Sequence, residues 1–172
     1  DAVYAGTCGD DLRWFYLEDG TLHIEGSGAM QDYATSSDNS AEYPPWEFLY
    51  SEITAVVFSG NITYIGQAAF QWNRRITSVS LPDSCVEIGR SAFEGCVNLA
   101  SIRFPDSVEI IGYRSFAGCK ALTSLEIQKT AKEIRVGAFE GCSNLQKIIL
   151  PAAPRLRYAC FFNIAPNAEV LF

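Results

Sequence analysis

The chain has few of the residues on which enzymes and metal sites depend. It contains one histidine, His23, and 6 cysteines among 172 residues. A lone histidine offers little for general acid–base catalysis or for zinc binding. The cysteine content lies well below the ~8–10% that is typical of a disulfide-built scaffold. The composition therefore favours neither an enzyme nor a disulfide framework, and we expect no cofactor and no metal.

Positive charge and long apolar runs are also scarce. The chain has 13 Lys and Arg residues against 20 Asp and Glu residues, which gives a formal net charge of −7. This charge opposes binding to nucleic acid or to anionic lipid. No apolar run approaches the ~20 residues of a membrane helix, so membrane insertion is not expected either. Hydrophobic residues still make up 48% of the chain, enough for the core of one domain or of a short repeat array.

A repeat of 22–23 residues organises the chain from residue 53 onward. Five apolar columns stay in phase to the C-terminus. The most regular column, whose members we expect to be buried, holds Phe70, Phe93, Phe116, Phe139 and Phe161. One unit cannot bury its own apolar edge, whereas stacked units bury a continuous one. The predicted units are 53–75, 76–98, 99–121, 122–144 and 145–166, with a closing strand at 167–172.

Each unit is expected to begin with a short strand. In the third unit Ile102 and Phe104 lie on one face of such a strand, and Pro105 suits its end. Stacked units would form a parallel sheet with about 4.8 Å between strands and right-handed connections. The six strands are predicted to centre on Val57, Ser80, Arg103, Glu126, Ile149 and Leu171.

The repeat pattern is similar to that of a known family. Leu99-x-x-Ile102-x-Phe104-Pro105, followed by Ile111-Gly112-x-x-Ser115-Phe116-x-Gly118-Cys119-x-x-Leu122, resembles the BspA-like leucine-rich repeats of bacterial surface proteins. The opening, with Gly6-Thr7-Cys8-Gly9, Asp19-Gly20 and Pro44-Pro45-Trp46, resembles the N-terminal segment that often precedes such repeats. The resemblance implies an α/β fold class, a right-handed leucine-rich-repeat solenoid with a short-stranded parallel β-sheet on its inner face.

Residues 1–52 lie outside the repeat and are expected to cap the array. Strand-like segments at 12–17 and 21–26 flank Asp19-Gly20, which is a strong hairpin signal. Polar residues follow, and Ser36 to Ser40 are predicted to form a surface loop. An exposed solenoid end presents apolar surface and an unpaired strand, so a β-hairpin cap is the simplest role for this segment.

Most of the cysteines are predicted to be buried and unpaired. Five lie in repeat columns that other units fill mostly with small or apolar residues: Cys85, Cys96, Cys119, Cys142 and Cys160. Three of these share one column, but a metal site built from them would lack a fourth ligand and an opening. Cys8 lies outside the repeat and is either packed in the cap or an exposed, labile thiol.

The outward-facing strand residues form the first candidate binding surface, because the inner curve is where such folds usually bind. The candidates are Ser78, Ser80, Ser101, Arg103, Ser124, Glu126, Lys147 and Ile149. Arg103 is expected to be the main anchor, since its planar guanidinium suits interfaces. Glu126 on the next strand is expected to hold it, in the part of the array predicted to be most regular.

Aromatic residues near the N-terminus form a second candidate surface. Trp14, Tyr33, Tyr43 and Trp46 would suit a sugar, although packing within the cap explains them equally well.

The expected function is a non-enzymatic protein-binding or adhesion module of a bacterial surface protein. The resemblance implies an extracellular or cell-surface location, with any secretion signal already removed, and a host surface or matrix protein as the partner. Two alternatives stay open. One is a structural spacer or fragment of a larger surface protein without a ligand of its own, and the other is a carbohydrate-binding module that uses the N-terminal aromatic residues.

Overall fold

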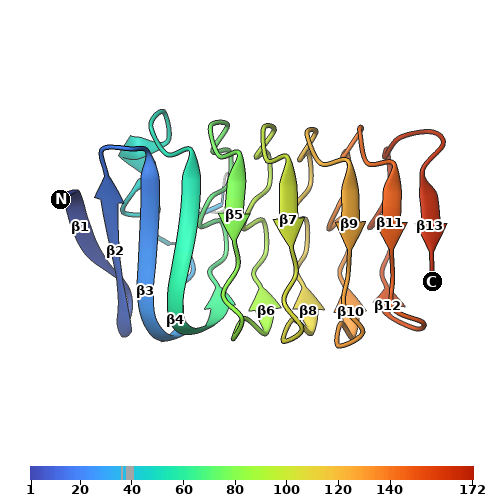
Figure 1. The fold of residues 1–172 in the computed structure, drawn as a ribbon, viewed down its shortest axis with the longest axis horizontal. Helices are drawn as coiled ribbons and strands as arrows, with labels where there is room; N and C mark the ends of the chain where they lie inside the picture. The colour runs from blue at the N-terminus through green and yellow to red at the C-terminus, as the bar shows by residue number, and fades with distance from the viewer. Residues whose placement is uncertain (36, 38–40) are drawn as a thin grey trace.

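Each repeat forms one turn of a coil, and successive turns lie side by side (Figure 1). The computed structural model describes residues 1–35, 37 and 41–172. The first row of strands, called the front row, holds β4 (Ala55–Ile65), β5 (Ser78–Ser80), β7 (Ser101–Arg103), β9 (Ser124–Glu126), β11 (Lys147–Ile149) and β13 (Glu169–Leu171). The second row holds β6 (Glu87–Ile88), β8 (Ile110–Ile111), β10 (Glu133–Ile134) and β12 (Arg155–Leu156). Strand pairs within both rows are parallel, which confirms the predicted solenoid.

The cap is a three-stranded antiparallel sheet that continues directly into the coil. Its strands are β1 (Ala2–Gly9), β2 (Asp11–Leu17) and β3 (Thr21–Ala29). The hairpin predicted around Asp19-Gly20 joins β2 to β3, and β3 pairs in parallel with β4. Strand β1 was not predicted, because its mostly exposed, Gly- and Ala-containing sequence lacks an alternating apolar pattern. The predicted surface loop at Ser36 to Ser40 lies almost wholly outside the described residues.

Helix contributes little to this fold. Among the described residues the structure has one helical turn, the 3-10 helix η1 (Glu47–Leu49). None of these residues forms a helix long and apolar enough to cross a membrane.

The centres predicted for the short strands are wrong by one residue. Each three-residue strand from β5 to β9 buries its middle side chain and exposes the two beside it. The strands therefore centre on Val79, Ile102 and Leu125, one position before the predicted Ser80, Arg103 and Glu126. Alternation identified the two faces correctly, but hydrogen bonding between turns sets where each strand begins and ends.

A column of stacked aromatic rings runs through the core. Trp46, Phe70, Phe93, Phe116, Phe139 and Phe161 follow one another with ring centroids 5.5, 5.2, 5.3, 5.4 and 5.5 Å apart. Their planes lie within 18° of parallel at every step. Four of the five phenylalanines are fully buried, as predicted, whereas Phe161 at the end of the stack is only partly buried.

The front row is interrupted between β7 and β9. Within residues 41–172, all of which the structure describes, no strand pairing joins β7 to β9, and the front row divides between two sheets. The second row continues across this point through β8 and β10, and the Phe116 N–H donates to the Ala138 carbonyl oxygen at 2.8 Å. Below the break, the Phe104 ring packs edge-on against Phe116 and Phe139, 5.5 and 6.2 Å away. The expectation that the array is most regular here is therefore wrong.

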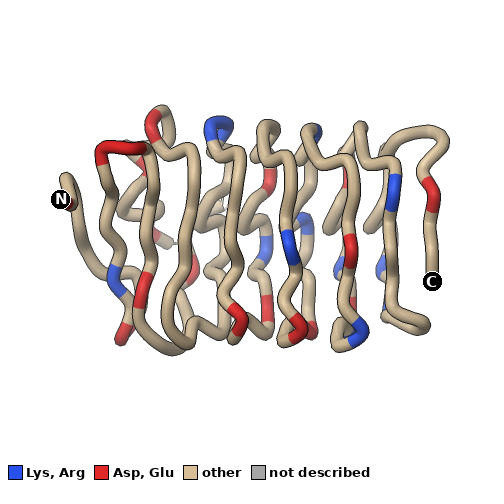
Figure 2. Tube along the Cα trace, in the orientation of Figure 1, with Lys and Arg blue, Asp and Glu red and all other residues tan. Residues whose placement is uncertain are grey.

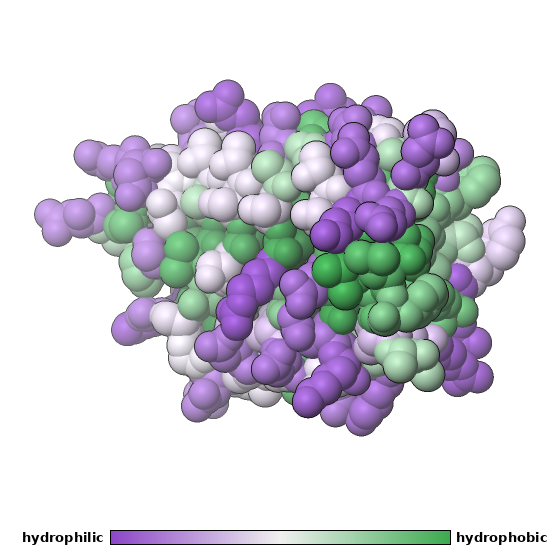
Figure 3. Space-filling model, turned by 45° about the vertical axis from the view of Figure 1, so that its right-hand side comes forward, coloured by the Kyte–Doolittle hydropathy of each residue, from purple (hydrophilic) through white to green (hydrophobic). Residues whose placement is uncertain are grey.

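The C-terminal end of the coil exposes apolar side chains. The exposed residues near β12 and β13 are Leu156, Tyr158, Phe162, Val170, Leu171 and Phe172. Figure 3, turned so that this end comes forward, shows a broad hydrophobic area on that side. Leu156, Val170 and Phe172 occupy positions that earlier turns bury, those of Ile134, Ile148 and Leu150, so they are the apolar edge of the last unit.

All six cysteines are buried and unpaired, which confirms the prediction for the five repeat cysteines and places Cys8 inside the cap. In one column the thiols of Cys96, Cys119 and Cys142 donate to the carbonyl oxygens of Phe70, Phe93 and Phe116 at 3.2, 3.3 and 3.2 Å. Burial raises the pKa of Cys85 and Cys142 from 9.0 to about 12. The thiols thus act as small core residues with one weak donor each.

Removing a ring from the middle of the stack should be costly. Phe116→Ala should lower the free energy of unfolding by about 3–5 kcal/mol, because it opens a cavity between two stacked rings. Urea denaturation measures this change. Phe162→Ala, which truncates an exposed ring, should change stability by about 0.5 kcal/mol or less. A similar loss in both variants would contradict the role of the stack.

The buried thiols predict a loss of stability at high pH. The unfolded chain releases its thiol protons near pH 9, whereas Cys142 in the folded chain keeps its proton up to about pH 12. Stability from this group is therefore complete below pH 9 and falls as the pH rises toward 12, by about 1.4 kcal/mol per pH unit. Cys142→Ala should show a shallower decline than the unchanged protein in denaturation series at pH 8 to 11. Parallel declines would contradict this.

Candidate functional site

The outward side chains of the front row lie together on one face, called the front face. Seven of the eight predicted candidates are exposed, and Ile149 is half-buried. Backbone pairing sets them in register, since Ser78 lies opposite Ser101 and Ser80 opposite Arg103. Beyond the break, Ser124 lies opposite Lys147 and Glu126 opposite Ile149. The structure thus brings all eight candidates onto a single exposed surface.

Charge on the front face alternates in sign along the array. Figure 2 shows basic residues on β7 and β11 and acidic residues on β9 and β13. Arg103 Nη1 lies 3.4 Å from Asp83 Oδ1 in its neighbouring turn. Among the described residues Arg103 makes no ion pair with Glu126, so the predicted support from Glu126 is wrong. The interruption between β7 and β9 explains why, because the two side chains do not stand on paired strands.

The front face continues onto the cap, which the sequence reasoning missed. Phe15 and His23 lie opposite each other on β2 and β3, and their rings stack with centroids 4.8 Å apart and planes 2° from parallel. His23 in turn lies opposite Val57, and Val57 opposite Ser80. The alternation of Phe15 with the buried Trp14 and Tyr16 was the available signal. The front face therefore extends onto the cap, where the Phe15–His23 stack lies beside the ion pair of Arg13 with Glu25.

Three of the four aromatic candidates in the cap are buried and cannot meet a ligand. Trp14, Tyr33 and Trp46 form a packed cluster in which the Trp46 ring contacts the other two edge-on, at centroid distances of 5.9 and 5.6 Å. Trp46 Nε1 also donates to the Ala69 carbonyl oxygen at 2.9 Å. The cluster closes the end of the aromatic stack, and the prediction of an aromatic sugar platform at these three residues is wrong. Tyr43 alone is exposed.

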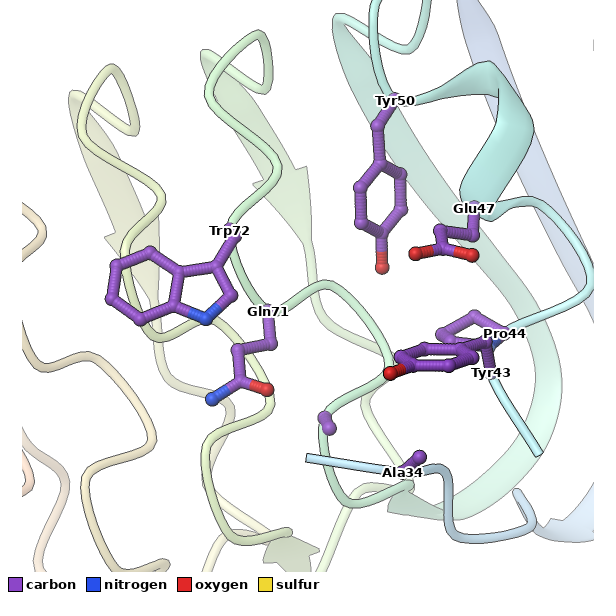
Figure 4. A pocket seen from close by; sticks show the side chains of 8 residues that line it. Ala34, Tyr43, Pro44, Glu47, Tyr50, Gln71 and Trp72 are labelled. Atoms are coloured by element: carbon purple, nitrogen blue, oxygen red, sulfur yellow. The ribbon is translucent and has the colours of Figure 1, made fainter. Parts of the chain in front are cut away.

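A pocket of about 310 Å³ lies beside Tyr43, where the cap meets the first turn. Its lining consists of Ala34, Tyr43, Pro44, Glu47, Tyr50, Ala68, Gln71 and Trp72 (Figure 4). The Tyr50 hydroxyl donates to the Ala69 carbonyl oxygen at 3.1 Å, and burial raises the pKa of Tyr50 well above its ordinary value. Gln71 Nε2 donates to Glu94 Oε2 at 2.8 Å. This volume lies at the lower end of the ~300–1,000 Å³ range of small-molecule sites.

Trp72, on the rim of this pocket, adopts an unusual backbone conformation. Its φ is 66°, in the left-handed region, and Gly95, Gly118 and Gly141 occupy the same repeat position with φ of 74°, 72° and 74°. A side chain in this region costs roughly 1–2 kcal/mol, which glycine avoids. The Trp72 ring also covers Gly95 so closely that a Cβ atom there would lie 2.2 Å from it. Sequence reasoning missed Trp72, although its replacement of a column glycine was visible.

No cluster of three or more His, Cys, Asp or Glu side chains with metal-binding geometry occurs among the described residues.

The comparisons with known proteins define the family of this chain. The model of the BspA-type leucine-rich repeat region matches residues 44–166 in 6 copies. The chain therefore belongs to the BspA-type leucine-rich repeat family. The match begins at residue 44, inside the segment predicted as cap. Among proteins with curated descriptions, none matches the chain.

Solved structures of bacterial leucine-rich repeat proteins share the fold. A leucine-rich repeat protein from Eubacterium ventriosum is 22% identical, with a TM-score of 0.65, over 95% of this chain and 44% of that chain. The leucine-rich repeat protein of T. pallidum is 27% identical, with a TM-score of 0.69, over 96% of this chain and 80% of that chain. One from Bacteroides ovatus is 24% identical, with a TM-score of 0.56, over 95% of this chain and 52% of that chain. The chain thus spans less than half of the first of these proteins.

Proposed function

We propose that the chain is a non-enzymatic, extracellular module of a bacterial surface protein that binds a protein ligand through its front face. The observation that carries the proposal is the alignment of the outward-facing side chains on the strands of the front row. Serines face outward on three neighbouring strands, β5, β7 and β9, and the last two also carry one charge each, Arg103 and Glu126. The middle side chain of each of these strands is buried in the core. Such a surface offers hydrogen-bonding groups on a rigid support, which lowers the entropic cost of binding.

Family membership supports the location and the class of function. BspA-type repeats are typical of bacterial surface proteins, and the chain matches their model over residues 44–166. The single histidine and the absence of a metal-binding cluster among the described residues favour a binding role over catalysis. The partner we propose is a host surface or matrix protein.

Arg103 is the strongest candidate anchor on this face. Its side chain is exposed, and the Asp83 side chain that it meets at 3.4 Å is also exposed, so this pair contributes little to stability. A ligand carboxylate can therefore replace Asp83 at low cost and gain two parallel hydrogen bonds from the guanidinium.

Binding to purified fibronectin, laminin and collagen, measured by biolayer interferometry, tests this proposal. Arg103→Ala should weaken the binding that is found by about 2 kcal/mol, roughly 30-fold in Kd, while the unfolding free energy changes little. Lys132→Ala is the matched control, because it removes an exposed ion pair with Glu109 away from the front face. Affinity that is insensitive to both Arg103→Ala and Glu126→Ala would contradict the proposal, and no binding to any of the three proteins would favour the spacer.

A further inference from the structure

Comparison of the repeat units shows that folding does not explain a tryptophan at position 72. Three later turns use glycine at this position, where the backbone is left-handed, and the fifth turn uses Asn163 with φ of 56°. Glycine and asparagine tolerate this conformation, whereas a bulky residue there is a rare outlier. The fold therefore does not require tryptophan at position 72. Strain of this kind gathers at functional sites, where the surrounding structure maintains it.

The conformation of Trp72 presents one face of the indole to solvent. The other face covers Gly95, and the side chain is still 47% exposed. Tyr43, which is 53% exposed, lies across the pocket from it, with Pro44 alongside (Figure 4). Two exposed aromatic side chains thus border one pocket of about 310 Å³. Exposed aromatic surface of this kind is costly in water and marks binding sites.

Fixed polar groups accompany the two rings. In Figure 4 the Tyr50 hydroxyl and the Glu47 carboxylate lie on the Tyr43 side of the pocket, and the Gln71 amide lies on the Trp72 side. Gln71 is held by Glu94, whose other carboxylate oxygen accepts from Arg114 Nε at 2.8 Å. Arg114 also donates to Glu140 at 2.6 Å. This chain of bonds spans four turns of the coil and fixes the orientation of the amide before any ligand arrives.

We propose that this pocket binds a neutral saccharide, with one pyranose ring stacked on the exposed face of Trp72 and its hydroxyl groups meeting Glu47, Gln71 and Tyr50. A pyranose has a flat C–H face for an aromatic ring and a rim of hydroxyls for polar groups. Glu47 is the one charged residue among the described residues that line the pocket, and the chain carries a net charge of −7. Both features disfavour sugar acids and sugar phosphates.

The shape of the site favours a flat ring over a compact cation. Quaternary ammonium ligands are held by several aromatic faces that surround the charge. One face of Trp72 is taken up by Gly95, so its free face forms a platform on the pocket rim. This site lies at the junction of cap and array, lined by residues distinct from those of the front face, and the proposal does not depend on the function proposed above.

A glycan array followed by fluorescence titration with each hit tests the proposal. The probes are neutral oligosaccharides of glucose, galactose, mannose and N-acetylglucosamine, up to 10 mM, with sialylated and phosphorylated glycans and tetramethylammonium as comparison ligands. Of the 3 tryptophans, Trp14 and Trp46 are buried, so a change in emission and protection from acrylamide quenching will report on Trp72. At least one neutral oligosaccharide should bind and protect this residue.

Trp72→Gly is the decisive variant, because it restores the residue that the repeat uses elsewhere and keeps the fold. It should weaken saccharide binding at least tenfold by isothermal titration calorimetry, with an unchanged or higher melting temperature. Tyr43→Ala should also weaken binding. Tyr158→Ala, which removes an exposed ring at the far end, and Arg103→Ala on the front face should leave it unchanged.

Three results would overturn the proposal. The first is no binding of any neutral glycan at 10 mM, and the second is binding that survives Trp72→Gly. The third is binding of tetramethylammonium or of acidic glycans alone.

Discussion

Stacking at the spacing of a parallel sheet is the constraint on which the rest of this structure depends. Neighbouring strands lie about 4.8 Å apart, so every turn must advance by nearly the same distance. The aromatic column meets this requirement with centroid steps of 5.2–5.5 Å and nearly parallel planes. Each turn must also reverse its backbone within a few residues, which brings two left-handed positions into the repeat, those of Ala68 and Trp72 in the first turn. The aromatic core, the column of buried thiols and the front face all repeat because every turn advances by nearly the same distance.

The same constraint makes a departure from the repeat informative. A residue in a repeating column is explained by the stack, as Cys96 and Phe93 are, and says little about a ligand. Trp72 differs from its column in size, and it carries a conformational cost that the glycines of later turns avoid. The break between β7 and β9 is a second departure, since the second row and the aromatic column cross it without interruption. Both departures lie at surfaces that the proposals assign to binding.

The sequence predicted the features that follow the repeat and failed for most of those that depart from it. Periodicity predicted the burial of the phenylalanine column, the buried thiols and the exposed side chains of the front row, because each of these repeats in the chain. It did not predict β1, the Phe15–His23 stack or the pocket, which depend on pairing between segments without a repeat. It also treated Trp14, Tyr33 and Trp46 as surface candidates, whereas closing the aromatic stack requires large buried rings at that end. Aromatic composition alone does not separate a residue that seals a core from one that faces a ligand.

The cap links these two roles in a single short segment. Trp46 stacks on Phe70 and closes the core, and this contact places Glu47, the first residue of η1, and Tyr50, which follows η1, against the first turn. The pocket therefore exists only where cap and array meet, and an array has one such junction however many turns it contains. The front face, in contrast, grows with every added turn. A binding function on the front face can thus vary with repeat number, whereas the pocket stays the same as long as the cap and the first turn are retained.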